Sequence, residues 1–277
     1  MKIGVIGTGN MGTILIEALL DADAVSPEQF TITNRSLAKA NLIKVRYPEI
    51  QIVASAESVA ANTDLIFICV KPLDIYNVIQ RIKPVLNRKQ CLISITSPIS
   101  VDQLESLVEC SCGRMIPSIT NRALSGVSLL TFGKECSDEW KDKVKWLAGS
   151  ISEPLEISNE ITRVSSDIVS CGPAFFSYLA RRFIEGACKT TAIDEETATA
   201  LTENMLIGLG DLLKKGFYTL PALEEKVCVK GGITGEGIQV LEKELGEVFE
   251  HLFEATHKKF KHELEKTEEQ YEVPYIT

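Results

Sequence analysis

The chain's regular structure starts with Ile3-Gly4-Val5-Ile6-Gly7-Thr8-Gly9-Asn10-Met11-Gly12, and this stretch decides the fold of the first half. The apolar run predicts a β-strand over residues 3–6, and apolar positions spaced by three and four from Met11 onward predict a helix. Glycines in the pattern G-x-G-x-x-G lie between strand and helix. This order is typical of the first βα unit of a dinucleotide-binding domain.

Each glycine has a physical role in such a unit. Gly7 permits the tight turn, Gly9 lets the backbone approach a pyrophosphate, and Gly12 lets the helix pack closely on the strand. The helix N-terminus offers amides and partial positive charge to the phosphates. The alternative is a plain βα turn, but a turn does not need glycines at this spacing. We therefore predict a cofactor loop made of Gly7, Thr8, Gly9, Asn10, Met11 and Gly12.

The residues after the second predicted strand indicate which dinucleotide binds. Residues 30–33 form that strand, and Asn34-Arg35-Ser36 follow where an NAD site has an acid. An acid repels a ribose 2′-phosphate, whereas Arg35 and Ser36 donate to it, and Lys39 lies one turn further. The alternative is that Arg35 is a solvated cation and Ser36 only a helix cap. The sequence favours NADP (NADPH), with NAD less favoured.

Strand and helix patterns alternate up to residue 157. Continuous apolar runs at 65–70 and 91–95 predict buried central strands, and β-type runs follow at 114–116, 126–131 and 151–157. Val70, Lys71, Pro72 and Thr96 come at the ends of the two central strands, on the carboxyl edge where a dinucleotide lies. Lys71 taken alone is equally a surface charge. Residues 1–157 are predicted to form an α/β Rossmann domain with a doubly wound, mostly parallel sheet.

From residue 158 the periodicity is almost wholly helical. An apolar stripe runs through 176–188, Pro173 is placed at a helix start, and acids at 194–196 open the next helix. Further helices are predicted at about 220–227, from 233, and over 247–264, and the charged tail from Glu265 is predicted to fray. An all-α domain over 158–277 follows. Its apolar positions occupy more than one helix face, which predicts a homodimer through this domain.

Composition excludes several classes of protein. The net charge of -9 argues against nucleic-acid binding, which needs a basic footprint. No stretch is apolar enough to span a membrane and the start does not resemble a signal peptide, so we expect a cytoplasmic protein without membrane partners. The eight cysteines contain no C-x-x-C pair, and no histidine lies near Cys110 and Cys112. A metal site is therefore not predicted, and most thiols are expected to be small core residues.

The chain resembles pyrroline-5-carboxylate reductases over nearly its whole length. The matching segments are Ile6-Gly7-Thr8-Gly9-Asn10-Met11-Gly12, Asn34-Arg35-Ser36, Val70-Lys71-Pro72, Ser94-Ile95, Arg114-Met115-Ile116-Pro117, Gly172-Pro173-Ala174-Phe175 and Gly231-Gly232-Ile233-Thr234. The resemblance implies an NAD(P)H-dependent enzyme that makes proline by reducing a cyclic imino acid. It also implies a helical domain that interlocks with its partner in a dimer, and a catalytic role for Thr234, whose hydroxyl can bond the imine nitrogen.

Three segments depart from the family pattern. The family's Met-Pro-Asn-Thr-Pro stands here as Ile116-Pro117-Ser118-Ile119-Thr120, and its Ser-Gly-Ser-Gly-Pro-Ala as Val169-Ser170-Cys171-Gly172-Pro173-Ala174. Its Ser-Pro-Gly-Gly-x-Thr substrate loop stands as Val229-Lys230-Gly231-Gly232-Ile233-Thr234. Such changes are similar to those of a divergent late-competence branch of the family in spore-forming bacilli. Cys171 is either a reactive thiol or a small buried residue beside the pocket.

The substrate loop has two interpretations. Under the resemblance, the amides of Gly232, Ile233 and Thr234 hold a substrate carboxylate at a helix N-terminus. Without it, the glycines form a turn and Thr234 is an N-cap. Val229 lacks the family's serine hydroxyl, a loss of about 1.5–3 kcal/mol for a bond to a charged group. Lys230 offsets this if it pairs with the carboxylate and contributes nothing if it points to solvent.

Three functions therefore remain open. They are NADPH-dependent reduction of pyrroline-5-carboxylate to proline, reduction of a related imine or keto acid, and a regulatory or interaction role for a cofactor-binding protein with weak or no reductase activity. The retained Gly231-Gly232-x-Thr234 favours the first, and the altered segments favour the other two. A β-hydroxyacid dehydrogenase is disfavoured because the helical half has no catalytic lysine motif, and Lys214-Lys215 lie at a helix end.

Overall fold

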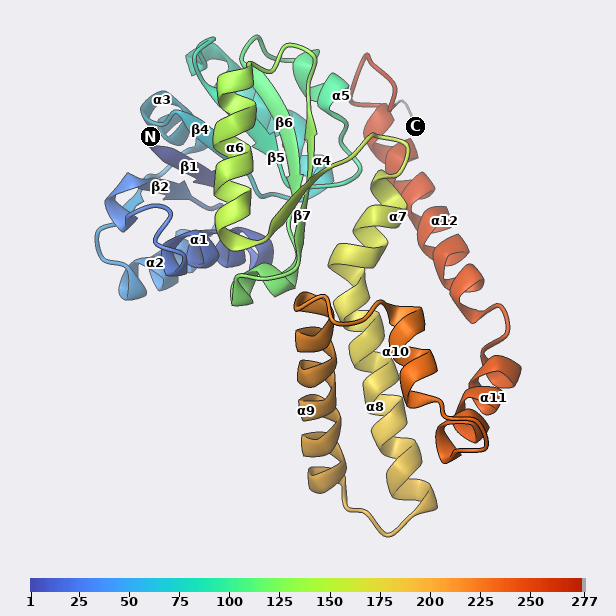
Figure 1. Cartoon of the computed structure of the whole chain (residues 1–277). Coiled ribbons are helices and arrows are strands. Elements are labelled where there is room, and N and C mark those ends of the chain that lie inside the picture. The colour runs from blue at the N-terminus through green and yellow to red at the C-terminus, as the bar shows by residue number, and fades with distance from the viewer. Residues whose placement is uncertain (276–277) are drawn as a thin grey trace. The chain divides into compact units, whose positions relative to one another are not determined.

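A computed structural model describes residues 1–275. The strands are β1 (Ile3–Ile6), β2 (Phe30–Thr33), β3 (Gln51–Ile52), β4 (Leu65–Ile68), β5 (Cys91–Ser94), β6 (Ser111–Ile116), β7 (Val127–Phe132) and β8 (Glu153–Glu156). The helices are α1 (Asn10–Asp21), α2 (Leu37–Arg46), α3 (Ala56–Asn62), α4 (Pro72–Ile82), α5 (Val101–Glu105), α6 (Asp138–Ile151), α7 (Thr162–Ser166), α8 (Gly172–Thr190), α9 (Glu195–Lys214), α10 (Leu220–Val227), α11 (Ile233–Leu245) and α12 (Val248–Glu268). Figure 1 follows them along the chain.

The strands form one sheet in the order β3-β2-β1-β4-β5-β6-β7-β8. All neighbours pair in parallel except β6 and β7, whose pairing is antiparallel. The chain builds outward from β1 to β3 and then returns to place β4 on the other side of β1. This reversal is the switch point where α/β sheets bind ligands, beyond the carboxyl ends of the strands. The predicted fold, a Rossmann domain followed by an all-α part, is confirmed.

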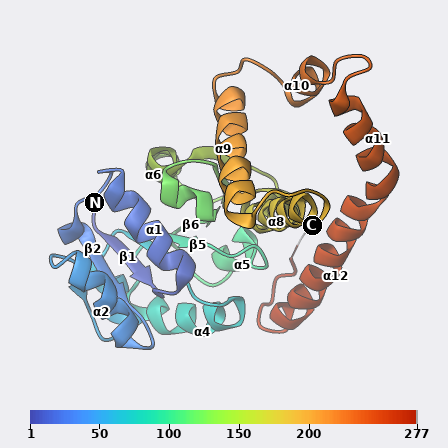
Figure 2. The ribbon, with the colours of Figure 1, turned by 90° about the horizontal axis from the view of Figure 1, so that it is seen from below.

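The central strands are buried on both faces, which explains their unbroken apolar runs. Leu65 and Phe67 of β4 pack with α1, α2 and α6, whereas Ile66 and Ile68 pack with α3, α4 and α5. Figure 2 shows α6 on one side of the strands and α4 and α5 on the other. Successive residues of a strand point to opposite faces, so a doubly covered strand has no polar alternation.

The chain divides into two compact units. One comprises Met1–Pro173 together with the segment from Ala255 onward, and the other is Ala174–Glu254. The unit with the sheet thus includes α7 and residues 255–268 of α12. Arg114 of β6 bonds Asn159 before α7 and Thr162 at its start. The domain boundary between residues 157 and 158 stays a prediction.

The helix at Pro173 begins earlier than predicted. α7 continues through a π-helical turn, Asp167–Cys171, directly into α8, so Pro173 lies inside a continuous helical segment. A proline has no N–H for the residue four positions back. The carbonyl of Val169 therefore lacks its usual helical donor, and the Ser118 hydroxyl donates to it at 2.7 Å. A side chain distant in sequence supplies the missing bond, so the helix does not need to start at the proline.

Up to Tyr275 the charged C-terminal tail is packed, which corrects the prediction that it frays from Glu265, and the last two residues of that prediction lie outside the described residues. α12 continues to Glu268, and the side chains of Tyr271 and Tyr275 are buried beyond it. These aromatic residues anchor a segment whose other side chains are mostly charged. In the part of the chain that the structure describes, no helix is long and apolar enough to cross a membrane.

Candidate functional site

The loop between β1 and α1 is closed by contacts that only glycine permits. Gly7 has a φ of +105°, and a Cβ there would lie 2.5 Å from the Cys69 carbonyl oxygen. A Cβ on Gly12 would lie 2.2 Å from the carbonyl oxygen of Gly7. Both distances are far below van der Waals contact with backbone atoms that cannot rotate away. The turn and the close seating of α1 therefore agree with the roles expected from the sequence.

The tip of this loop is open and suited to an anion. A Cβ on Gly9 would meet no atom within 4 Å, and Gly9 and Asn10 are exposed. Gly9 is the N-cap of α1, which has no side-chain cap and no acid in its first turn. The buried hydroxyl of Thr8 has no hydrogen-bond partner among residues 1–275. Uncapped amides, a helix dipole and an orphaned donor fit a phosphate of a dinucleotide.

Asn34 links this loop to the loop after β2, a role that the motif alone did not reveal. Its Oδ1 accepts from the Thr8 amide at 3.0 Å, and its Nδ2 donates to the Ser36 carbonyl at 3.0 Å. The Gly7 amide also donates to the Thr33 carbonyl at 2.9 Å. The end of β2 is thus held beside the glycine-rich loop.

The cations after β2 are free to meet a ligand. Arg35, Ser36 and Lys39 are exposed, and neither cation has an ion-pair partner within residues 1–275. Ser36 occupies the N-cap position of α2, but its side chain makes no capping bond. The capping alternative for Ser36 therefore gains no support. A hydroxyl and a guanidinium are left at the place where a ribose 2′-phosphate would lie.

Two further loops lie at the same edge of the sheet. Lys71 is the exposed N-cap residue of α4, and Pro72 is the first residue of that helix, as expected from its fixed φ. Val70 precedes them as a half-buried residue. After β5, the Thr96 amide donates to the Ser94 hydroxyl at 3.3 Å. These loops surround the switch point between β1 and β4.

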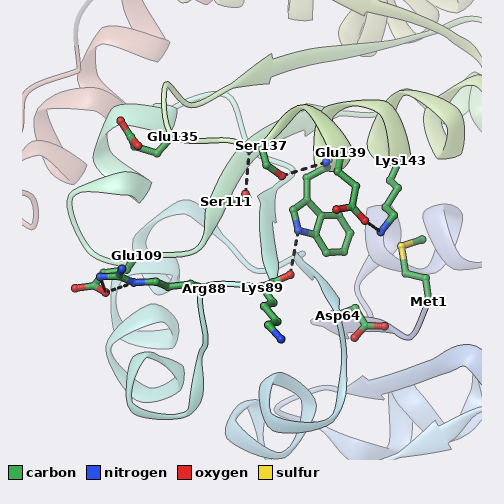
Figure 3. A pocket seen from close by; sticks show the side chains of 11 residues that line it. Met1, Asp64, Arg88, Lys89, Glu109, Ser111, Glu135, Ser137, Glu139 and Lys143 are labelled. Atoms are coloured by element: carbon green, nitrogen blue, oxygen red, sulfur yellow. Dashed lines mark hydrogen bonds and ion pairs between the residues drawn. The ribbon is translucent and has the colours of Figure 1, made fainter.

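A large pocket at the opposite edge of the sheet does not match the cofactor site. It holds about 860 Å³, and its lining includes Asp64, Lys89 and Ser111, which lie at the amino ends of β4, β5 and β6 (Figure 3). Its charges are largely paired, as in the Arg88–Glu109 ion pair at 2.8 Å. A dinucleotide binds beyond the carboxyl ends instead.

The predicted substrate loop lies in the second unit, between α10 and α11. Gly231 has a φ of +74°, and Gly232 is the N-cap of α11. Thr234 is therefore in the first turn and is not the N-cap that the alternative interpretation required. The Gly232 amide donates to the Val229 carbonyl at 2.8 Å, which removes it from the predicted carboxylate-binding set.

The remaining groups of that loop are accessible. Within residues 1–275 the amides of Ile233 and Thr234 and the Thr234 hydroxyl donate to no acceptor, and both residues are exposed. Lys230 is exposed and has no ion-pair partner in the same residues. Val229, 69% exposed, offers no polar side-chain atom. A helix N-terminus with two open amides, a hydroxyl and a nearby cation can hold a carboxylate.

Ser118, which replaces a family asparagine, has a structural role here. It is fully buried, and besides donating to Val169 it accepts from the Thr120 amide at 3.3 Å. In the reverse direction, the Ser170 hydroxyl donates to the Pro117 carbonyl at 3.0 Å. These bonds fasten the segment after β6 to the π-helical turn. Each of these two altered segments thus supplies a hydroxyl donor to a backbone carbonyl of the other.

Cys171 belongs to a polar cluster around α7. Arg163 donates to the buried carboxylate of Asp167 at 2.8 Å and lies 3.7 Å from the Cys171 sulfur. Burial raises the pKa of the Cys171 thiol, and the neighbouring Arg163 only partly offsets this. A raised pKa lowers the thiolate fraction at neutral pH, which favours the interpretation of Cys171 as a small packed residue.

The fold and the glycine-rich loop define a nicotinamide-dinucleotide-dependent oxidoreductase, and comparison with known proteins agrees. Residues 2–98 match the family model described as NADP oxidoreductase coenzyme F420-dependent, and residues 159–263 match the one described as pyrroline-5-carboxylate reductase dimerisation. The chain belongs to the pyrroline-5-carboxylate reductase family, and the resemblance read from its motifs is confirmed.

The relatives place the chain on the divergent branch. It is 52% identical to ComE operon protein 4 (ComER) of Bacillus subtilis over 273 residues, which cover 99% of this chain and 100% of that protein. It is 28% identical to pyrroline-5-carboxylate reductase 3 of the same organism, covering 94% and 95%. The NADP-bound structure of Plasmodium falciparum pyrroline carboxylate reductase shares the fold, with a TM-score of 0.80, 23% identity and 98% of each chain covered.

Proposed function

We propose that the protein catalyses the NADPH-dependent reduction of pyrroline-5-carboxylate to proline. The observation that carries this proposal is the open N-terminus of α11, where Thr234 presents an exposed hydroxyl after a Gly231-Gly232 turn. That arrangement keeps the glycines and the threonine of the family's substrate loop. The phosphate-binding loop between β1 and α1 supports the same activity by providing for the cofactor.

The residues have separate parts in this reaction. The amides of Ile233 and Thr234 hold the substrate carboxylate, and Lys230 adds positive charge beside it. The Thr234 hydroxyl donates to the imine nitrogen and fixes the orientation of the ring, and the nitrogen takes the proton that the reduction requires from water. NADPH, held by the loops at the carboxyl edge of the sheet, supplies the hydride when bound. Positioning of the two reactants contributes most of the rate enhancement.

Replacing Thr234 with Ala should reduce turnover without affecting the cofactor. Loss of one hydrogen bond to the reacting group costs about 1.5–3 kcal/mol, so kcat/KM for pyrroline-5-carboxylate should fall roughly 10- to 100-fold. The assay is NADPH oxidation followed by absorbance, with NADH alongside. Thr234→Ser keeps the hydroxyl and serves as the matched variant, which should retain most of the activity. An unchanged rate for Thr234→Ala would remove the hydroxyl from the mechanism.

A second candidate function rests on the changes in the substrate loop. Val229 and Lys230 replace the family's serine and proline, and the 52% identical relative carries a competence-operon name. We infer as the alternative a cofactor-binding regulatory protein, or a reductase of a related imine or keto acid. NADPH binding in a fluorescence titration without turnover of pyrroline-5-carboxylate would favour this alternative over the reductase.

We propose NADP as the cofactor, supported by the exposed Arg35, Ser36 and Lys39 after β2 and by the absence of an acid there. Arg35→Ala should weaken NADPH binding roughly 10- to 100-fold, because a charge-assisted pair with the 2′-phosphate is lost, and leave NADH binding within about twofold. Lys44→Ala is the control, since Lys44 is an exposed cation further along α2. Equal losses for NADPH and NADH would contradict the assignment.

We also propose a homodimer formed through the second unit. Phe176 and Phe183 lie seven residues apart on α8 and are 66% and 67% exposed, and Leu201 of α9 is 61% exposed. Apolar faces of this extent mark an interaction surface. The family model that matches residues 159–263 is described as pyrroline-5-carboxylate reductase dimerisation, which supports the same arrangement.

Phe183→Glu should convert the dimer to a monomer in sedimentation experiments at micromolar concentration. Burying an unpaired carboxylate in an apolar interface costs several kcal/mol, so the two chains should associate at least about 100-fold more weakly. Leu42→Glu is the control, because Leu42 of α2 is similarly exposed, at 70%, but lies in the other unit. A dimer that persists in Phe183→Glu would place the interface elsewhere.

A further inference from the structure

The C-terminal segment after α12 is fastened to the sheet unit by side-chain contacts. The Tyr271 ring packs edge-to-face on Tyr76 of α4, with centroids 5.4 Å apart. The side-chain amide of Gln103 of α5 donates to the Val273 carbonyl at 3.3 Å, and Figure 1 shows the red segment that follows α12 beside that helix. The segment therefore bridges α4 and α5, which follow the two central strands.

Tyr275 carries the bonds at the end of this segment. Its hydroxyl donates to the Ser97 carbonyl at 3.1 Å and accepts from the Arg114 guanidinium at 3.0 Å. The ring packs edge-to-face on Phe260 of α12, with centroids 5.9 Å apart. Since Tyr275 is 6% exposed, these bonds are sheltered from water and from competing donors.

Arg114 extends the same network to the loop after β5. Its guanidinium donates to the Ser97 carbonyl at 3.2 Å and to the Ile99 carbonyl at 3.3 Å. The Tyr275 hydroxyl and the Arg114 guanidinium thus both donate to the Ser97 carbonyl. The backbone of residues 97–99 has no strand or helix to hold it, so these side-chain bonds set its position.

That loop is part of the edge where the cofactor is expected. Residues 97–99 directly follow Thr96 at the carboxyl end of β5, and β5 neighbours β4 and hence the switch point. A shift of residues 97–99 would therefore change the dinucleotide site. The glycine-rich loop is a separate part of that site, because it follows β1. The C-terminal segment and the loop after β5 are 178 residues apart in sequence at the Tyr275–Ser97 bond, so no local pattern couples them.

We propose that Tyr275 is a positioning residue through which the C-terminal segment holds the Ser97–Ile99 backbone in the conformation that binds the nicotinamide dinucleotide. This inference rests on the proposed function as far as the cofactor is concerned. Removing the hydroxyl leaves the Ser97 carbonyl with one donor fewer and lets the loop populate other conformations. The apparent dissociation constant rises as the competent fraction falls. We expect NADPH to bind roughly 3- to 10-fold more weakly, since one net hydrogen bond contributes about 0.5–1.5 kcal/mol.

The test compares two identical substitutions in the same segment. Tyr275→Phe removes a hydroxyl that makes two bonds. Tyr271→Phe removes a buried hydroxyl that has no hydrogen-bond partner among residues 1–275. NADPH is titrated by fluorescence well below the melting temperature of each full-length variant, and amide hydrogen exchange is measured for the peptide that covers residues 96–100. We expect weaker NADPH binding and faster exchange in Tyr275→Phe, and wild-type values in Tyr271→Phe.

A melting temperature that falls in Tyr275→Phe while the NADPH dissociation constant and the exchange of residues 96–100 stay at wild-type values would overturn the proposal, because the hydroxyl would then act on stability alone. Equal weakening in both variants would overturn it as well. Wild-type protein that binds NADPH without reducing pyrroline-5-carboxylate would overturn the proposed reductase activity and leave the positioning test intact. Wild-type protein that binds no NADPH would overturn both.

Discussion

Gly12→Ala is expected to weaken NADPH binding and to destabilise the sheet unit. The new Cβ would lie 2.2 Å from the Gly7 carbonyl oxygen and 3.1 Å from the Cys69 Cβ. Because the first of these atoms belongs to the backbone, relief requires α1 to move away from β1. Overpacking of this kind costs about 3 kcal/mol, and the displaced helix should bind NADPH at least about tenfold more weakly.

The measurements for Gly12→Ala are thermal unfolding and a NADPH titration, with Gly149→Ala as the matched control. Gly149 is an exposed residue of α6 whose Cβ would meet Pro154 only at an ordinary 3.8 Å. Alanine there should be neutral or stabilising by up to about 1 kcal/mol, through helix propensity. Equal melting temperatures and equal NADPH affinities for wild type and Gly12→Ala would show that the close helix–strand contact is not required.

The start of the first unit could be predicted closely because its determinants are local, whereas the predicted runs at 114–116 and 151–157 differ in their bounds from β6 and β8. The strand at residues 3–6, the glycine-rich turn and the start of α1 follow one another within twenty residues, and the predicted strand bounds agree with β1 and β2. Continuous apolar runs at β4 and β5 indicate strands covered on both faces, which the structure shows. The short strand β3 was missed, because its two residues carry no pattern.

The features that sequence reasoning missed depend on partners far apart in the chain. Pro173 indicates a helix start by local rules, yet the Ser118 hydroxyl satisfies the carbonyl of Val169 and lets the helix continue. The charged tail indicates fraying, yet Tyr271 and Tyr275 find sites on the sheet unit. The two aromatic side chains within a polar tail were the signal that could have revealed this packing.

Arg114 is the clearest case, since it lies in a β-type run and gave no sign of being a buried hub. It is 1% exposed, and its guanidinium also donates to Thr131 at 3.2 Å, to Asn159 at 2.9 Å and to Thr162 at 2.6 Å. Within residues 1–275 no carboxylate pairs with it, so neutral acceptors of its two terminal nitrogens compensate for its lost hydration, and its Nε has no hydrogen-bond partner. The network joins β6 and β7 to Asn159 before α7 and to Thr162 at the start of that helix.

Arg114→Met should be among the most destabilising substitutions in this chain. Methionine keeps much of the volume but leaves the carbonyls of Ser97 and Ile99 with fewer donors in a site that water does not reach. The substitution also removes a buried charge, which by itself is favourable. The acceptors left without donors outweigh this gain, because each costs about 1–3 kcal/mol and several are affected. We therefore expect a net loss of about 3–5 kcal/mol in the free energy of unfolding.

Arg114→Lys separates the charge from the geometry of the guanidinium. Lysine keeps the positive charge, but its three donors lie on one nitrogen atom. It therefore cannot reach the acceptors on both sides that the planar guanidinium reaches. Denaturant unfolding should therefore show a loss of about 1.5–3 kcal/mol for Arg114→Lys, between wild type and Arg114→Met. Arg88→Met is the control, because Arg88 is 80% exposed in its pair with Glu109 and such pairs contribute at most about 1 kcal/mol. If Arg114→Lys proved as stable as wild type, the charge alone would suffice. If Arg114→Met proved as stable as wild type, the hydrogen-bond network would be dispensable. Tyr275 and the Ser97–Ile99 loop would then have to be held by packing.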